Sequence, residues 1–167
     1  MMYRSMVRVV VVAGALGLMA SSAEAQLGGI GTASGTDKLR VKGCGKGKAP
    51  AAFNFTVSDD GTWFARDEEG YFFSGGYSAV SAKKFDLRFD SGSEALFVAN
   101  LENVASSLCG QGVNVTSAVR QKFFLKVNKK RTKAKVRAKY SLTGTAGGEP
   151  GTAKYILKAA GPYTEVQ

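Results

Sequence analysis

The sequence KFDLRFDSGSEALFVANLENVASSLC, residues 84–109, contains the change of hydrophobic period that decides the fold. At its start, apolar and charged residues alternate, which predicts a β-strand with one buried face. From about residue 92, apolar residues recur every three or four positions, which predicts an amphipathic helix over about 92–109. Ser91 with Glu94 fits a capping box, and Gly110 fits the glycine that follows a helix end.

Strand-like alternation returns on both sides of this helix. Turn residues, such as Asp59-Asp60-Gly61, separate the alternating runs. We expect a mainly β protein with about eight strands, five before the helix and three after it, in a single domain over residues 38–167. The expected strands cover about 38–42, 53–57, 62–66, 71–77, 84–90, 120–127, 132–142 and 153–159.

Antiparallel strands joined by short turns have to dispose of their unpaired edges, and closure into a barrel does this completely. We therefore expect an antiparallel up-and-down barrel, or a strongly curved sheet, with the helix inserted after the fifth strand and covering one end or side. A two-sheet sandwich is the alternative. An outer-membrane barrel fits poorly, because the face opposite the apolar one carries Lys and Arg in mid-strand where lipid would require apolar side chains.

Residues 1–25 have the three parts of a cleavable signal peptide. Arg4 and Arg8 precede a mostly apolar run over 9–20, and Ala23-Glu24-Ala25 provides small residues at a cleavage site before Gln26. The apolar run is shorter than the roughly 20 residues that a transmembrane helix needs. We expect an exported protein, periplasmic or secreted from a bacterium, with no transmembrane span after cleavage. The Gly-rich residues 26–37 are expected to form a flexible leader.

The chain contains two cysteines, Cys44 and Cys109. In an oxidising compartment an even number of cysteines favours a disulfide, with two buried free thiols as the alternative. A bond between them would attach the end of the helix to the first strand region. No histidine is present to activate a cysteine nucleophile.

Positive charge is concentrated in the C-terminal part. The chain has 23 Lys and Arg against 13 Asp and Glu, and after Cys109 only Glu149 and Glu165 are acidic. Period-two spacing places many of these cations on one side of their strands, which makes an anion-binding face possible; a solvated face that keeps the protein soluble is the alternative. The candidate anion-binding residues are Lys122, Lys126, Lys133, Lys135, Arg137 and Lys139, with Lys154 and Lys158 on a later strand.

Candidate partners of this face are lipopolysaccharide, anionic lipid and acidic polymers. Nucleic acid is not an expected partner, because the face has few of the aromatic side chains on which single-stranded bases stack.

Aromatic residues dominate the expected interior. They could line a cavity for a small apolar or amphipathic ligand, or they could simply fill the core. The residues concerned are Phe53, Phe55, Trp63, Phe85, Phe89, Phe123 and Tyr140.

Gly61-Thr62-Trp63 resembles the Gly-x-Trp motif of the lipocalins, eight-stranded barrels that carry small hydrophobic molecules. The resemblance covers this tripeptide and the strand count. Here the motif follows an earlier strand, and the helix interrupts the strands. The chain is more similar to small exported bacterial proteins with lipocalin-like barrels and no assigned role. The resemblance implies that Trp63 packs at the barrel base.

Catalysis is not expected. The chain lacks histidine, and its paired carboxylates, Asp59-Asp60 and Asp67-Glu68-Glu69, fall in expected hairpin turns without the spacing of a calcium loop. The glycines of residues 43–48 lack the spacing of a phosphate-binding loop. We expect no cofactor or metal, and a non-enzymatic protein that holds an apolar ligand in its barrel. The alternatives are a module that docks on anionic envelope surfaces and a structural envelope protein with no discrete ligand.

Overall fold

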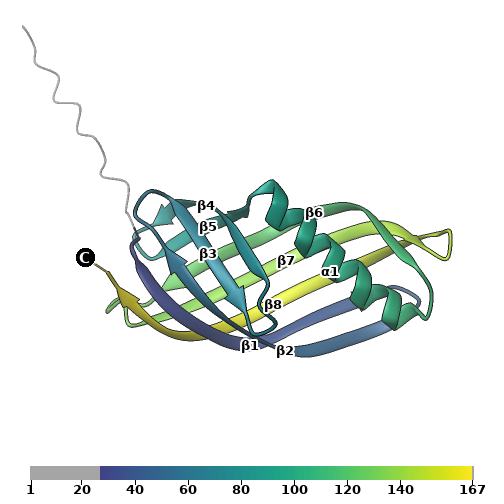
Figure 1. Ribbon diagram of the computed structural model, residues 1–167, viewed down its shortest axis with the longest axis horizontal. Helices are drawn as coiled ribbons and strands as arrows, with labels where there is room; N and C mark the ends of the chain where they lie inside the picture. The colour runs from purple at the N-terminus through teal and green to yellow at the C-terminus, as the bar shows by residue number, and fades with distance from the viewer. Residues whose placement is uncertain (1–26, 167) are drawn as a thin grey trace, which may run out of the picture.

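The computed structural model describes residues 27–166, so the expected signal peptide, residues 1–25, lies outside the described residues. The described chain forms a closed barrel of eight antiparallel strands, each paired with its neighbours in sequence, with β8 returning to pair with β1. Figure 1 shows the elongated barrel, with a helix lying along it. The expected up-and-down barrel is confirmed, and the sandwich alternative is wrong. The strands are β1 (Gly29–Val41), β2 (Gly45–Val57), β3 (Thr62–Asp67), β4 (Phe72–Ser81), β5 (Lys84–Phe89), β6 (Val113–Val127), β7 (Lys133–Ala146) and β8 (Glu149–Glu165).

Helix α1, Ser91–Cys109, is the one helix among the described residues, and it follows the fifth strand as the sequence predicted. Its N-cap is Asp90, whose carboxylate accepts the backbone N–H of Ser93 at 2.8 Å, so the cap lies one residue before the expected Ser91. Gly110 ends the helix with a left-handed φ of 66°, a conformation that glycine adopts without steric cost. Phe97, Leu101 and Ala105 form the buried stripe of the helix.

The expected flexible leader is wrong from Gly29 onward, because residues 29–37 form the first part of β1 and pair with both β2 and β8. Its glycines serve close approach between strands. A Cβ on Gly31 would lie 2.5 Å from the ring of Phe55, and one on Gly35 would lie 1.9 Å from the carbonyl oxygen of Lys158. Glycine in a strand commonly marks such crowding.

The barrel wall is uneven because β3, β4 and β5 are shorter than each of the other five strands. The β5–β6 ladder has three pairs, and β2 pairs with β3 only from Phe53 onward. The first part of β2 and the first part of β6 therefore have a strand partner on one side only. Helix α1 lies over this opening in the wall (Figure 1).

Side chains of α1 satisfy the free edge of β6. The N–H of Val113 donates to Ser106 Oγ at 2.9 Å, and the N–H of Val115 donates to Glu102 Oε1 at 2.7 Å. On the other side of the opening, Leu108 lies against Gly47 of β2. The helix therefore covers the wall where strands are missing, and it satisfies two backbone N–H groups at the β6 edge.

The expected disulfide between Cys44 and Cys109 is confirmed. It joins the β1–β2 turn to the last residue of α1, with the two Cα atoms 4.7 Å apart and a sequence separation of 65. The bond thus attaches the far end of the helix to the rim of the barrel.

Candidate functional site

The seven aromatic residues predicted for the interior all face inward. Phe55, Trp63, Phe85, Phe123 and Tyr140 are buried, while Phe53 and Phe89 are half-buried at the margin of the same core. The indole N–H of Trp63 lies 3.1 Å from the carbonyl oxygen of Gly76 and 3.0 Å from that of Arg88, so its polar atom is satisfied within the wall.

These rings pack against one another rather than around an empty space. The ring centroids of Phe89 and Phe123 are 4.8 Å apart, and those of Trp63 and Phe123 are 5.4 Å apart. Phe97 of α1 enters the same cluster, with its centroid 4.9 Å from that of Tyr140 and 5.2 Å from that of Tyr155. Such separations are those of directly contacting aromatic pairs. The helix therefore fills the middle of the barrel with its own ring.

The sequence interpretation missed Phe97 and Tyr155 as members of this interior cluster. The helical period predicted an amphipathic helix over about 92–109, but not that the ring of Phe97 points into the barrel. Burial raises the pKa of both the Tyr140 and the Tyr155 hydroxyl, so both stay neutral at physiological pH. Asp37, on the same side of β1 as buried Leu39, also has a pKa raised by burial.

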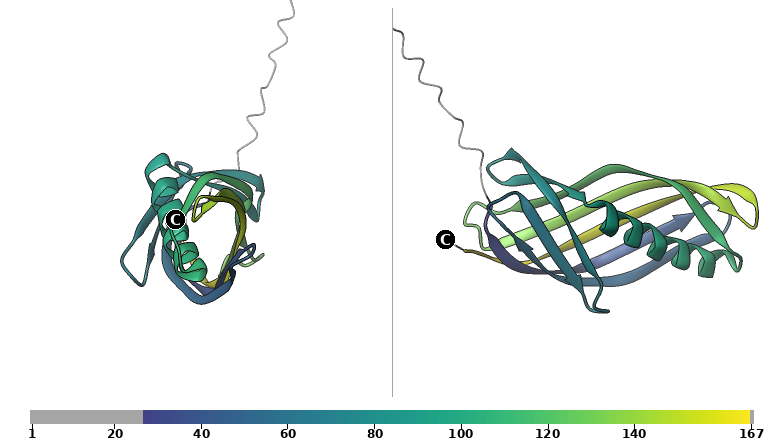
Figure 2. Two further views of the ribbon diagram at one scale, coloured as in Figure 1. Left: turned by 90° about the vertical axis from the view of Figure 1, so that its right-hand side faces the viewer. Right: turned by 45° about the horizontal axis from the view of Figure 1, so that its top comes forward.

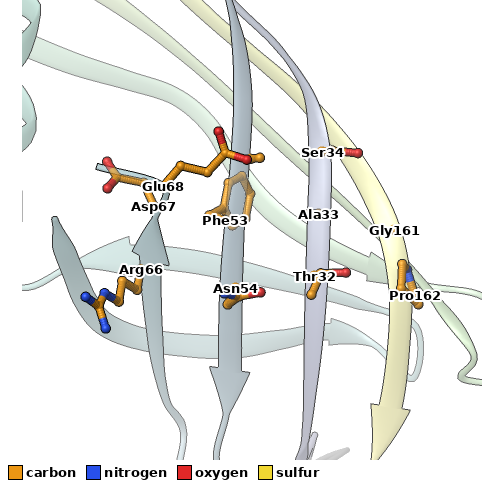
Figure 3. Close-up of a pocket in the computed structure, with 11 residues that line it drawn as sticks. Thr32, Ala33, Ser34, Phe53, Asn54, Arg66, Asp67, Glu68, Gly161 and Pro162 are labelled. Atoms are coloured by element: carbon orange, nitrogen blue, oxygen red, sulfur yellow. The ribbon is translucent and has the colours of Figure 1, made fainter. Parts of the chain in front are cut away.

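Two hollows lie away from the centre of this cluster. The larger, about 240 Å³, is lined by residues of four neighbouring strands, β1, β2, β3 and β8, and Figure 3 shows that Phe53 shares it with polar side chains such as Asn54. The smaller, about 20 Å³, lies at the far end of the barrel near Val41, Ala105 and Leu142. This second volume is about that of one water molecule.

The six predicted anion-binding residues lie on the outer faces of β6 and β7. Lys122, Lys126, Lys133 and Lys135 are exposed, and Arg137 and Lys139 are half-buried by their neighbours. The strand register places Lys126 directly opposite Lys135, and Lys122 directly opposite Lys139. The register therefore brings the predicted cations of β6 next to those of β7.

Barrel closure adds residues that the sequence interpretation did not assign to this set. Because β8 pairs with both β7 and β1, outward cations from the two ends of the chain lie side by side. We call the resulting set the Lys/Arg rows. Its twelve members are Lys38 and Arg40 of β1, Lys46 and Lys48 of β2, Lys122 and Lys126 of β6, Lys133, Lys135, Arg137 and Lys139 of β7, and Lys154 and Lys158 of β8.

Six pairs within the Lys/Arg rows place like charges directly opposite each other on neighbouring strands. Such pairs destabilise a sheet, because cross-strand side chains are close neighbours. The pairs are Lys126–Lys135, Lys122–Lys139, Arg137–Lys158, Lys154–Arg40, Arg40–Lys46 and Lys38–Lys48.

Acidic side chains do not offset these pairs. Within residues 27–166, the three ion pairs use Arg88, Arg120 and Arg131, none of which belongs to the rows. The five strands that carry the rows contain three acidic residues: Asp37, which faces inward, and Glu149 and Glu165, which occupy the two ends of β8. The middle of this surface therefore carries Lys and Arg without acidic partners.

One carboxylate in each of the two hairpin-turn groups has a structural partner. Asp60 accepts the N–H and the hydroxyl of Thr62, which lowers the pKa of Asp60, and Asp67 accepts the N–H of Tyr71 at 2.8 Å. Among the described residues, no group of three or more His, Cys, Asp or Glu side chains is placed to hold a metal ion. Asp60 and Asp67 therefore act as turn caps.

No helix within residues 27–166 is long and apolar enough to span a membrane. No protein-family model matches the chain, and no curated protein matches its sequence.

Proposed function

We propose that this protein is an exported, non-enzymatic interaction module that binds anionic components of the cell envelope through the Lys/Arg rows. The observation that carries the proposal is the set of six like-charged cross-strand pairs. A face that only had to be soluble could alternate charges of both signs and gain stability from each pair. The twelve cations repel one another without acidic partners, which lowers the stability of the free protein. A bound polyanion would remove this repulsion.

Placement of the cations supports binding by many weak contacts. Most members of the rows are exposed lysines, whose ammonium groups act as point charges on flexible stems. Binding of this kind is strongly dependent on salt, because each contact is screened by mobile ions. The proposed export of the mature chain would bring this surface to lipopolysaccharide, acidic polysaccharide or anionic lipid.

The alternative of an apolar ligand inside the barrel remains a prediction. The rings of Phe89, Phe97, Phe123 and Tyr140 contact one another and so occupy space that a ligand would need. An internal ligand therefore has less support than a ligand on the outer surface. Native mass spectrometry of protein purified from its host would test it, since a retained small molecule would appear as an added mass.

A comparison of two double variants tests the proposed function. Lys46→Gln with Lys154→Gln removes both direct neighbours of Arg40 from the rows, whereas Lys83→Gln with Arg88→Gln removes two exposed charges from the β4–β5 turn and β5. Both variants change the net charge equally. On an anionic resin, we expect the first to elute at clearly lower salt than the second. Equal elution of the two variants would mean that net charge alone governs retention and would refute the proposal.

A further inference from the structure

The Lys/Arg rows run across the strands rather than along them. One row crosses five strands through Lys122 of β6, Lys139 of β7, Ile156 of β8, Lys38 of β1 and Lys48 of β2. Neighbouring strands lie about 4.8 Å apart, so this row follows roughly 19 Å of barrel wall at the backbone. A second row, two residues further along the strands, contains Lys154, Arg40 and Lys46.

These rows follow a convex surface. The barrel is closed, and the five strands from β6 through β8 and β1 to β2 take up more than half of its strand order. Figure 2, left, looks along the barrel and shows these strands curving around it. Four strand-to-strand steps out of eight turn the outward direction by about half a circle, so Lys122 and Lys48 face away from each other. A flat bilayer that contacted one of them could not contact the other.

A flexible chain of anions can contact both ends of such a row. The side chains between the cations indicate what kind of chain fits. Ser141 lies opposite Lys154, and Thr36 lies opposite Lys158, so hydroxyl groups stand beside the charges. Stacking surfaces are scarce: Phe124 is half-buried with the ammonium of Lys84 5.0 Å from its ring centroid, and the exposed Phe64 and Phe72 lie on β3 and β4. A polymer of charged, hydroxylated units matches this surface better than one with bases.

We infer that the ligand of the Lys/Arg rows is a flexible linear acidic polysaccharide that crosses the strands and wraps around the barrel from β6 to β2. This inference rests on the proposed function and makes it specific. It predicts that affinity rises with polymer length until the chain reaches both β6 and β2, and that cations at the two ends of the row contribute to the same complex.

Oligogalacturonates of graded length provide the test, with binding followed by calorimetry at low and moderate salt. The two ends of the row are removed separately, as Lys122→Gln with Lys126→Gln on β6 and as Lys46→Gln with Lys48→Gln on β2. The Lys83→Gln and Arg88→Gln variant is the control. Phosphatidylglycerol vesicles and oligothymidylate of matched charge are the competing ligands, and a thermal melt of each variant verifies folding.

We expect each end variant to weaken binding of the long oligomers by roughly three- to ten-fold at low salt, which corresponds to the loss of two screened contacts, while the control changes it little. Weakening by only one of the two end variants would overturn the wrapping. Tighter binding of vesicles than of the oligogalacturonate would overturn the polysaccharide but leave the proposed function standing. Tighter binding of oligothymidylate would overturn both, because nucleic acid is not an envelope component. No binding of any of the three ligands would overturn both.

Discussion

Arg40 of β1 lies directly opposite Lys154 of β8, at the seam where the first and last strands close the barrel. Lys46 of β2 faces Arg40 from the other side, so three cations stand in one row. The repulsion within this row predicts that Lys154→Glu stabilises the free protein by roughly 0.2–1 kcal/mol, because an opposite charge then faces Arg40. Urea unfolding at low salt measures this change. The gain should shrink at high salt, and Lys83→Glu should give none; a gain independent of salt would contradict the electrostatic explanation.

The disulfide predicts a large dependence of stability on redox state. Because Cys44 and Cys109 are 65 residues apart, their bond restricts the unfolded chain strongly. The double variant Cys44→Ser, Cys109→Ser should lose about 4 kcal/mol of unfolding free energy on the chain-entropy estimate. Denaturant titration of the variant and of the reduced wild type measures the loss. The two samples should agree, and a loss below about 1 kcal/mol would show that the unfolded chain remains compact without the bond.

Phe97 should be the helix residue on which the fold depends most. Its ring lies among Phe89, Tyr140 and Tyr155, so Phe97→Ala leaves a void at the middle of the barrel. Large-to-small changes at such sites cost about 3–5 kcal/mol. Val104→Ala on the exposed side of the same helix is the matched control and should change the unfolding free energy by less than about 0.5 kcal/mol. Similar losses of unfolding free energy in both variants would mean that α1 stabilises the fold through its helical structure and not through the packing of the Phe97 ring.

Much of the fold could be predicted because the hydrophobic period changes cleanly from strand to helix at residues 84–109 and back again near residue 120. The hydrophobic period fails where the expected strands are shorter than the observed ones. Residues 29–37 and 45–52 are rich in Gly, Ala and polar residues and have no clear alternation, yet both are paired in the barrel. Residues 45–52 pair only with β1 through the hairpin, whereas residues 29–37 also pair with β8 because the barrel closes, and a local pattern records neither partner.

The Lys/Arg rows also contain some residues that the sequence pattern could predict and others that it could not. Lys122, Lys126 and the β7 cations alternate along strongly periodic strands, so their shared face could be recognised from the sequence. Lys38, Arg40, Lys46 and Lys48 belong to the same rows only because β8 returns to β1. Sequence separations of more than 100 residues, as between Arg40 and Lys154, carry no local signal of contact.

The N-cap of α1 predicts a loss of stability in acid. Hydrogen bonds from Ser74 and from the N–H of Ser93 lower the pKa of Asp90 below its usual 3.8. A carboxyl group with a lowered folded-state pKa stabilises the fold fully above its unfolded pKa, and this contribution disappears as the pH falls through the folded value. Unfolding free energies of wild type and Asp90→Ala should therefore converge below about pH 4. Asp90→Asn, which can cap but not titrate, should lack this pH dependence, and a constant gap between wild type and Asp90→Ala would refute the explanation.

A substitution at Gly35 tests whether the first residues of the described chain form a structural strand or a dispensable leader. A Cβ at Gly35 would lie 1.9 Å from the carbonyl oxygen of Lys158 and 2.7 Å from the Cα of Ala159, so Gly35→Ala has to displace the backbone of β8. Overpacking of this kind costs about 1–3 kcal/mol. In a flexible leader the same change would be neutral. Thermal unfolding measures the difference, with exposed Ser34→Ala on the same strand as the control.

Because β8 carries Lys154 and Lys158, its displacement should also weaken retention of the Gly35→Ala protein on an anionic resin. Unchanged stability and retention together would contradict the closure of the barrel through β1.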